Sequence, residues 1–488
     1  MVSHKNKRQN ILKNLIFASI MAFFIVATIK VEAQGNDISV QRRIISLKLG
    51  QVTNINYATN QNDDLKYLSN NIMVATIDQN GNIVGNMIGS TTIVGKDING
   101  NTSETIVIVY RDLLEPLSKI SEPRFILENG VYKNKSAKDT NNALLMFTGD
   151  LMSQTRQQEA AKTEDGTYIF NDSFNMVKNI FSQADFVAGN LESLLSNTSP
   201  YMSEEKKLNG EPHCNGPSTY LDALKYAGFD ALVTSNNHIT DNGERGLLQT
   251  LDLLEEYKLA YTGAFRNNKE QRFIIVDING IKIALMSYSE IFNGKDVTLD
   301  EDVREIMINR YTKEAIEKDV KDAKAMGAEY IIAYNHWGEE YTNKYNEDQK
   351  ISAEEMANAG VDFIIGSHPH ALQTYEVIKT KDNREVPVVY SLGNFISHQY
   401  KPITKDNFIL TLNLKRDKEG KIYLSDKGYI PCYVFEEYDN IPYLVTPISK
   451  NFNGEVENVE LNESYMRIKD VVNGSIPEIT SYEELKNK

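Results

Sequence analysis

Histidine side chains follow two short apolar runs in the C-terminal half of the sequence. The run at 330–334 ends in Asn335-His336, and the run at 362–366 is followed by His368 and His370. Each run has the length and composition of a buried β-strand, with a helical pattern before it. Imidazole nitrogen is a common ligand of divalent metals. A metal-dependent site is therefore the leading hypothesis.

Two further helix–strand units end in polar residues that could join the same site. They are a helix at 174–182 and a strand at 185–188 before Asn190 and Glu192, and a helix at 221–228 and a strand at 229–234 before Asn237 and His238. Open α/β sheets bind ligands at the carboxyl ends of their strands. We therefore expect these side chains to meet at one edge.

Six residues are the candidate metal ligands: Asp150, Glu192, Asn237, His336, His368 and His370. Their carboxylate and imidazole groups suit Zn, Mn and Fe, and a shared carboxylate can bridge two ions. One or two ions would polarise a phosphoryl or acyl oxygen and generate a hydroxide nucleophile near neutral pH. His238 is better placed as a catalytic acid or oxyanion donor, oriented by Asp241.

Each candidate also has a purely structural interpretation. Asp150 could be a turn residue or helix cap, and Asn190 and Asn237 could be turn residues. His336 stands beside Trp337, the only tryptophan, and could be a packed core histidine. The joint pattern favours function, because four of the seven histidines follow predicted strands.

The composition limits the classes of partner. The chain has 488 residues, 41% of them hydrophobic and 24% charged, which is ordinary globular usage with room for two or three domains. Its net charge of −15 excludes a general nucleic-acid binder, which needs a basic surface. This negative charge would repel a polyanionic substrate unless a metal ion or a basic groove offset it at the binding site. Cys214 and Cys432 could pair in an exported protein or remain as two thiols.

The N-terminal 33 residues have the pattern of an export signal. Basic residues between Lys5 and Lys13 precede an uncharged run at 15–29, and Val31-Glu32-Ala33 resembles a cleavage site. We expect export to the outer face of the cell membrane or secretion, with residues 1–33 cleaved or kept as a membrane anchor. The alternative is a buried helix of the fold.

Residues 36–110 predict a small all-β domain. The segment 45–49 alternates apolar and polar residues, 93–95 and 105–109 are strand-like, and 79–82 is typical of a hairpin turn. The segments 74–84 and 89–93 resemble the bacterial Ig-like domains of group 2, and we interpret this domain as a spacer or adhesion module. Residues 111–140 are polar and irregular and are predicted to be a linker.

The α/β pattern occupies residues 141–435. It begins with a buried-strand run at 143–148 before Asp150, and strands at 408–414 and 429–435 close it. A polar insertion at 196–216 is expected to form a wall or lid of the site. Residues 436–488 are mixed and polar and are predicted to be a C-terminal extension.

An ordered set of motifs resembles the CapA family of poly-γ-glutamate capsule biosynthesis proteins, a branch of the calcineurin-like metallophosphoesterase fold. The motifs are Gly149-Asp150, Asn190-Leu191-Glu192, Asn236-Asn237-His238 with Asp241 and Gly243, His336-Trp337-Gly338 with Glu340-Tyr341, His368-Pro369-His370 with Gln373, and 391–395. The likeness covers roughly 144–401. It implies an α/β fold, a four-layer α/β/β/α sandwich with the site at one edge, preceded here by the small all-β domain.

The resemblance assigns roles to individual residues. Asp150 and His370 would serve the first metal, Glu192 would bridge, and Asn237, His336 and His368 would serve the second, with His238 as the catalytic histidine. Two positions depart from a typical phosphoesterase: Met152 stands where a histidine is usual, and Glu192 where an aspartate is usual. The first metal would therefore lack one ligand. The residues expected to contact substrate are Asn190, Asn236, Trp337, Glu340 and Asn394.

Two functions from different classes are compatible with these motifs. The first is an exported metal-dependent hydrolase or transferase acting on a phosphoester, or on an amide bond of an anionic cell-envelope polymer such as poly-γ-glutamate. The second is a non-catalytic subunit of a membrane synthase that binds the growing polymer. In either case the expected partners are membrane synthase subunits, with membrane association through the N-terminus.

Overall fold

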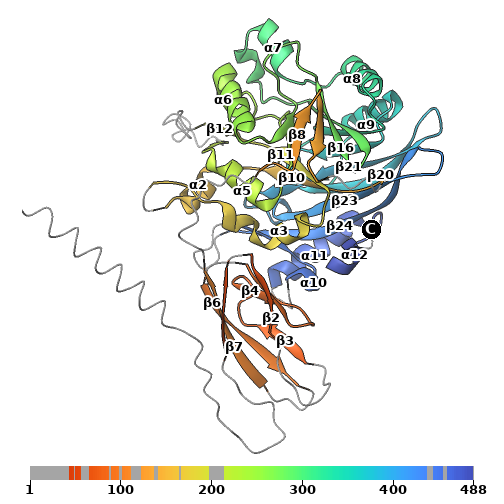
Figure 1. The fold of residues 1–488 in the computed structure, drawn as a ribbon. Helices are drawn as coiled ribbons and strands as arrows, with labels where there is room; N and C mark the ends of the chain where they lie inside the picture. Colours follow the sequence, from red (N-terminus) through yellow and green to blue (C-terminus); the bar gives the residue numbers. More distant parts are fainter. Residues whose placement is uncertain are drawn as a thin grey trace, which may run out of the picture. The chain divides into compact units, whose positions relative to one another are not determined.

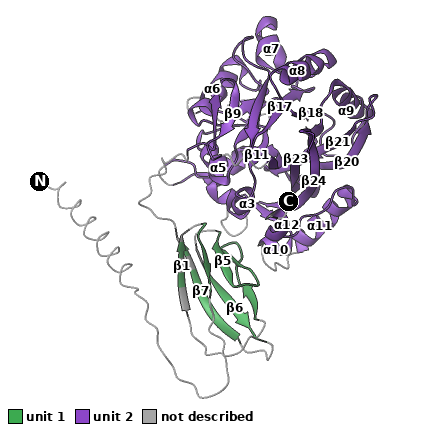
Figure 2. Cartoon of the chain, turned by 45° about the vertical axis from the view of Figure 1, so that its right-hand side comes forward, with its two compact units in different colours: residues 1–112 green, residues 113–488 purple. Residues whose placement is uncertain are grey.

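The computed structural model describes residues 43–48, 50–55, 65–86, 89–97, 102–110, 122–136, 141–163, 166–196, 214–436, 443–453 and 459–486. The chain divides into two compact units, Met1–Asp112 and Leu113–Lys488, which have different colours in Figure 2. The predicted export signal at 1–33 lies outside the described residues. Among the described residues, no helix has both the length and the apolar character needed to cross a membrane.

The smaller unit consists of two sheets in its described part. One has the order β1 (Arg43–Lys48), β7 (Thr102–Tyr110), β6 (Gly89–Lys96) and β3 (Lys66–Ser69), and the other β2 (Val52–Asn54), β5 (Asn82–Gly85) and β4 (Ala75–Ile77). Leu47, Ile83 and Val107 belong to their common core. β4 and β5 pair antiparallel across the predicted turn. The all-β architecture is confirmed for these strands, and the assignment to bacterial Ig-like domains stays a prediction.

The larger unit contains two eight-stranded sheets (Figure 1). The first sheet has the order β15 (Ala260–Thr262), β14 (Ala231–Val233), β11 (Phe186–Leu191), β10 (Asn142–Leu151), β23 (Asp406–Arg416), β24 (Ile422–Phe435) and β25 (Leu444–Pro447), with β22 (Asn394–Ile396) beside β10. The second sheet has the order β20 (Leu372–Lys379), β21 (Glu385–Leu392), β19 (Phe363–Ser367), β18 (Tyr330–His336), β17 (Ile281–Ser289), β16 (Phe273–Ile278), β9 (Val131–Asn134) and β8 (Phe125–Glu128). A separate short pair joins β12 (Leu194–Leu195) to β13 (Asn215–Gly216).

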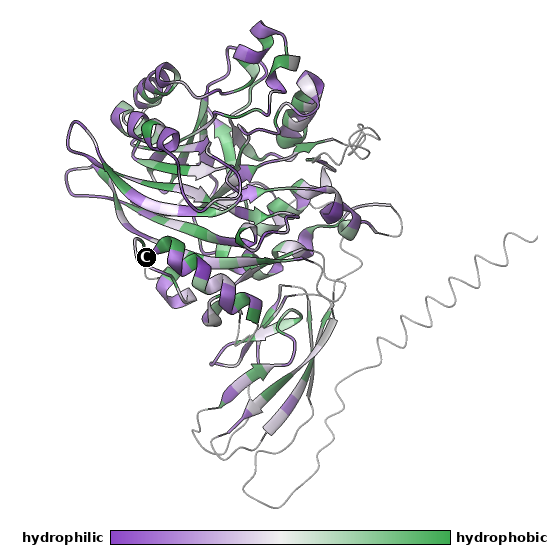
Figure 3. Cartoon of the chain, turned by 180° about the vertical axis from the view of Figure 1, so that it is seen from behind, coloured by the Kyte–Doolittle hydropathy of each residue, from purple (hydrophilic) through white to green (hydrophobic). Residues whose placement is uncertain are grey.

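Helices flank the two sheets of the larger unit (Figure 1). They are α2 (Thr155–Ala161), α3 (Asn175–Phe181), α5 (Thr219–Ala227), α6 (Gly243–Glu256), α7 (Glu301–Met307), α8 (Lys313–Ala325), α9 (Glu347–Ala359), α10 (Lys450–Asn453), α11 (Val459–Val472) and α12 (Tyr482–Lys486), with short 3-10 turns η1 (Asn171–Phe174), η2 (Asp296–Thr298) and η3 (Pro402–Thr404). These helices carry both hydrophilic and hydrophobic turns (Figure 3), as expected of helices with one face on a sheet. A capping box at Asn346 begins α9, and Gly360, at φ 114°, ends it.

Three apolar cores separate the layers of the larger unit. Leu145 of β10 lies in the core between the sheets with Leu285 of β17. The neighbouring Met146 points the other way, into a core that includes residues of α3, α5 and α6. Met286 similarly faces α8 and α9. Alternate residues of one apolar run thus pack on opposite sides, which is why these strands are apolar throughout. The predicted four-layer α/β/β/α sandwich is confirmed.

Two predicted boundaries differ from the structure. Residues 125–134, expected within the 111–140 linker, form the β8–β9 hairpin, and β9 pairs with β16. Arg124 next to this hairpin forms a two-point ion pair with the buried carboxylate of Asp230. The expected extension at 436–488 also belongs to the sandwich, because β25 pairs with β24 and Ile468 of α11 enters the central core.

Candidate metal centre

The predicted ligands come from both sheets and meet at one edge. Asp150 lies near the end of β10 and Glu192 directly follows β11. Asn237 lies in the loop after β14, His336 ends β18, and His368 and His370 lie in the loop after β19. All six side chains are buried, with exposed fractions between 0% and 4%. The expectation that these strand ends share one site is confirmed.

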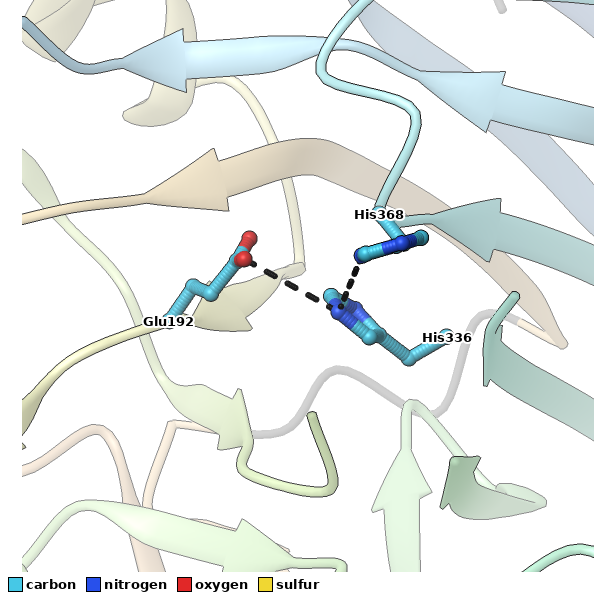
Figure 4. A group of neighbouring side chains, drawn as sticks. All are labelled: Glu192, His336 and His368. Carbon is cyan, nitrogen blue, oxygen red and sulfur yellow. Dashed lines mark hydrogen bonds and ion pairs between the residues drawn. The ribbon is translucent and has the colours of Figure 1, made fainter. Parts of the chain in front are cut away.

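Glu192, His336 and His368 form one group that could hold a metal ion (Figure 4). The ring of His336 lies between the other two side chains. Its Nε2 is 3.8 Å from Oε1 of Glu192 and 3.1 Å from Nδ1 of His368. The amide oxygen of Asn237 is 3.1 Å from the same Nε2. Four donor atoms from separate strand ends thus converge on one point.

Asp150, Glu192 and His370 form the second group. Nδ1 of His370 lies 3.1 Å from Oδ2 of Asp150, and its Nε2 lies 3.8 Å from Oε1 of Glu192. Gly149 makes this geometry possible, because a Cβ there would lie 1.8 Å from the carbonyl oxygen of Gly393. The close approach lets β10 pair with β22, opposite Asp150. Glu192 belongs to both groups, as expected of a bridging ligand.

Glu192 Oε1 is a fully buried carboxylate oxygen with no hydrogen-bond partner among the described residues. Nε2 atoms of His336, His370 and His238 surround it at 3.8, 3.8 and 4.0 Å. These separations are too long for hydrogen bonds, and those to His336 and His370 fit ligands that share an ion with Glu192 at bonds of about 2.0–2.2 Å. A buried acceptor without a donor is costly. The residues present therefore fit a divalent metal, and their chemistry leaves its identity open among Mn, Zn and Fe.

The local charges are those of a site built for a cation. Burial, and then the neighbouring Asp150, raise the pKa of Glu192 well above its usual value. Burial, and then the adjacent His368, lower the pKa of His336 well below its usual value. Burial and then His370 lower the pKa of His368 to about 3. The imidazoles of His336 and His368 are therefore neutral, which is the form that binds metal.

His238 is held by a chain of polar contacts beside the two groups. Its Nδ1 is 2.9 Å from Oδ2 of Asp241, and Nζ of Lys295 donates to Oδ1 of Asp241 at 2.9 Å. Burial alone would raise the pKa of Asp241, but the contacts with His238 and Lys295 outweigh it and lower that pKa. The ionised carboxylate holds the proton of His238 on Nδ1, so Nε2 faces the cluster. The predicted pairing of His238 with Asp241 is confirmed.

Of the five residues expected to contact substrate, three support the metal ligands, one is exposed, and Trp337 is described separately below. Asn190 and Asn236 are buried and bonded within the site, Asn190 to Asp150 at 2.8 Å and Asn236 to Asn190 at 3.2 Å. Asn394 is also buried, with Oδ1 2.9 Å from Nδ1 of His370. Glu340 is exposed. The first three therefore support the ligands, and Glu340 is open to solvent.

The prediction that Trp337 contacts substrate is wrong. Its side chain is fully buried, and its Nε1 donates to the carbonyl oxygen of Tyr390 at 2.9 Å. It packs in the core beneath α8 and α9. Successive strand residues point to opposite faces, so His336 enters the site while Trp337 enters the core behind it.

Several residues of the site were missed by the sequence prediction. Ser367 pairs across the strands with His336, and its Oγ is 3.0 Å from Nδ1 of that ring. Tyr341 lies over His370 with 5.9 Å between ring centroids, and Nζ of Lys401 lies 4.0 Å from the Tyr341 centroid. His368, His370 and Tyr341 have φ of 95°, 56° and 66°, a region that non-glycine residues rarely adopt. Such strain concentrates at functional sites.

The family and sequence comparisons agree with one another. A family model described as bacterial capsule synthesis protein PGA_cap matches residues 144–399. The chain is 30% identical over 281 residues to the capsule biosynthesis protein CapA of Bacillus anthracis, covering 57% of this chain and 65% of that protein. It is 30% identical over 277 residues to the PGA biosynthesis protein CapA of Bacillus subtilis strain 168, covering 56% and 68%. The match thus spans just under two thirds of the first relative.

Two solved structures share only a distant likeness with the chain. One is the calcineurin-like phosphoesterase YfkN from Bacillus subtilis, with a TM-score of 0.36 and 13% identity, covering 67% of this chain and 97% of that one. The other is the NAD nucleotidase of Haemophilus influenzae, with a TM-score of 0.38 and 15% identity, covering 71% and 58%.

Proposed function

Since this chain belongs to the bacterial capsule synthesis protein family, we propose that it takes part in making or exporting poly-γ-glutamate or a similar anionic capsule polymer. Within that process it acts as a metal-dependent hydrolase or transferase. The bond it acts on is a phosphoester, or an amide bond of the polymer. It works outside the cytoplasm, held at the membrane through its N-terminus and alongside membrane synthase subunits.

The observation that carries the proposal is the environment of Glu192 Oε1. Three imidazole nitrogens face this buried, unbonded oxygen at 3.8–4.0 Å. A cluster that only stabilised the fold would satisfy the oxygen with a donor. Glu192, His336, His368 and Asn237 would hold one ion, and Glu192, Asp150 and His370 another. A bound ion supplies Lewis-acid polarisation of an acyl or phosphoryl oxygen and an activated hydroxide.

The remaining side chains have roles that follow from their positions. Asp241 holds His238 so that Nε2 faces the metal ligands, at 4.0 Å from Glu192. Nε2 of His238 can therefore accept a proton at this point and give it to a leaving group. Ser367 and Asn394 fix the rings of His336 and His370 through their Nδ1 atoms. Such outer contacts orient metal-binding imidazoles.

The experiment compares metal content and polymer production. His336→Ala and Asp150→Ala each remove a ligand, and both should lower bound metal and polymer yield. Asp322→Ala, on the outer helix α8, is the matched control and should change neither. Metal is measured on purified protein and polymer in cells that carry each variant. The hydrolase proposal fails if wild-type protein holds no stoichiometric metal and neither ligand variant alters polymer production.

Binding and cleavage assays on the purified protein distinguish the enzyme from a non-catalytic, polymer-binding subunit. Met152, buried where a phosphoesterase usually has a histidine, leaves the Asp150 group with three ligands and favours this second function. For a binding subunit, metal loss would weaken polymer binding, but purified wild-type protein with metal would cleave neither a phosphoester nor a γ-linked glutamate oligomer.

A further inference from the structure

Cys214 lies next to the metal centre, although no motif of the sequence analysis included it. Its carbonyl oxygen accepts a hydrogen bond from the backbone of Leu194 at 2.8 Å, directly before the β12–β13 pair. Leu194 is two residues after Glu192. This pairing therefore fixes the position of Cys214 relative to the bridging ligand. The thiol is fully buried and forms no disulfide.

The thiol is the first member of a row of contacting groups. Sγ of Cys214 lies 3.7 Å from Nε2 of His238, within hydrogen-bonding distance for sulfur. Nδ1 of His238 lies 2.9 Å from Asp241, whose other oxygen accepts from Lys295 at 2.9 Å. A nucleophile beside a base, with the base oriented by a third group, is the signature of nucleophilic catalysis.

A second feature connects this row of groups to the metal centre. Glu192 Oε1, buried and without a hydrogen-bond partner among the described residues, lies 4.0 Å from the same Nε2 of His238. The thiol and the metal-binding carboxylate thus meet at one imidazole nitrogen. His238 Nε2 therefore joins the thiol to the metal-binding carboxylate.

We propose that Cys214 is a catalytic nucleophile and that the substrate is an amide, such as a γ-glutamyl amide of the capsule polymer. The proposal rests on the hydrolase function proposed above. It narrows the class of bond that the protein cleaves, from a phosphoester or an amide to an amide. Cys432, the other cysteine, is equally buried but contacts the backbone of Ile430. Burial raises the pKa of Cys432, as expected of an inert thiol.

The reaction balances without any further reactant except water. His238 Nε2 accepts the thiol proton while Sγ bonds to the acyl carbon. The carbon–nitrogen bond then breaks, and His238 gives the proton to the departing amine. Water attacks the resulting thioester, with His238 accepting its proton and returning it to Sγ, which releases the carboxylate and restores the thiol. If an amine attacked the thioester in place of water, the acyl group would be transferred to that amine.

The test looks for the thioester on the metal-loaded full chain. A short γ-linked glutamate oligomer is added, the reaction is stopped with acid, and the intact mass is recorded. The wild type and Cys432→Ala should gain one acyl mass that maps to Cys214. Cys214→Ala and Cys214→Ser should bind as much metal as the wild type, lack the thioester and cleave the oligomer at least about 100-fold more slowly.

The outcomes distinguish this inference from the proposed function. If Cys214→Ala cleaves the oligomer at the wild-type rate, Cys214 is not the nucleophile, and the proposal of a metal-dependent hydrolase is unaffected. The same conclusion follows if the wild-type protein cleaves a phosphoester but forms no acyl adduct. If the wild type holds no metal, the proposed function fails instead, whatever the state of Cys214.

Discussion

Oε1 of Glu192 and Nε2 of His336 lie 3.8 Å apart although they belong to different sheets. Glu192 follows β11 of the first sheet, and His336 ends β18 of the second. Their separation therefore depends on how the two sheets pack over the central core. The metal centre is a property of the assembled sandwich, and neither sheet alone contains it.

Removing the charge of Glu192 should release metal. Glu192→Gln keeps the size of the side chain but weakens a ligand shared by both groups. Asn190→Ala is the control, because Asn190 bonds to Asp150, Glu192 and Asn236 but belongs to neither metal-binding group. We expect the first variant to be purified with little metal and the second to retain most of it, as measured by elemental analysis. Equal retention would remove Glu192 from the bridging position.

The side chain of Ser367 should affect metal affinity only through its contact with His336. Its hydroxyl fixes the ring of His336 at Nδ1. Loss of such an outer partner lowers metal affinity about 10–100-fold. Ser367→Ala should therefore show this weakening in a competition titration with a chelator, while His336→Ala binds more weakly still. Wild-type affinity in Ser367→Ala would contradict the orienting role.

Asp241 should affect turnover without affecting metal content. Asp241→Asn keeps the shape of the side chain but no longer fixes the proton of His238 on Nδ1. Positioned acid–base groups contribute about 100-fold or more to rate. We expect a loss of that size in kcat on a γ-linked glutamate oligomer, with metal content unchanged. A variant that loses its metal instead would place Asp241 among the groups that build the metal site.

Trp337 should contribute to stability and not to substrate binding. Truncating a buried aromatic side chain costs about 3–5 kcal/mol, so Trp337→Ala should lower the free energy of unfolding by that amount in urea. Glu340→Ala, at an exposed position nearby, should change it by less than about 0.5 kcal/mol. A stable Trp337→Ala protein with weaker substrate binding would reverse our assignment.

Acid should destabilise the metal-free protein. Burial lowers the pKa of His368 to about 3 in the folded state, whereas an unfolded histidine titrates near about 6.5. Between these values the unfolded chain binds more protons, so stability falls as pH falls through this window. Urea unfolding of chelator-treated protein at several pH values should show the slope. In His368→Gln the free energy of unfolding should change less steeply with pH. A slope identical to that of the wild type would show that His368 does not cause the pH dependence.

Most metal ligands could be predicted because each follows an apolar run. The strand ends of β10, β11, β14, β18 and β19 are visible locally in the sequence, and sheet geometry brings them together. This reasoning located Asp150, Glu192, His336, His368 and His370. The grouping around two ions, with Glu192 shared, was implied by the family resemblance, and the structure supports it.

The parts that were missed depend on contacts between distant segments. The β8–β9 hairpin consists of two four-residue strands, and β9 finds its partner β16 far along the chain, at Phe273–Ile278. Such short, half-exposed strands have no clear local pattern. Ser367 and Cys214 stand in no recognisable sequence motif, and only their proximity to His336 and His238 in the structure identifies them. The prediction for Trp337 failed because neighbours along a strand face opposite sides of the sheet.

The most direct test of the metal centre is anomalous diffraction from crystals of the full chain, combined with elemental analysis of the same protein. We predict at least one stoichiometric ion, bound by Glu192, His336 and His368, with any second ion between Glu192, Asp150 and His370. Metal-free protein that is active, or an ion bound elsewhere while these side chains hydrogen-bond only to one another, would contradict the account.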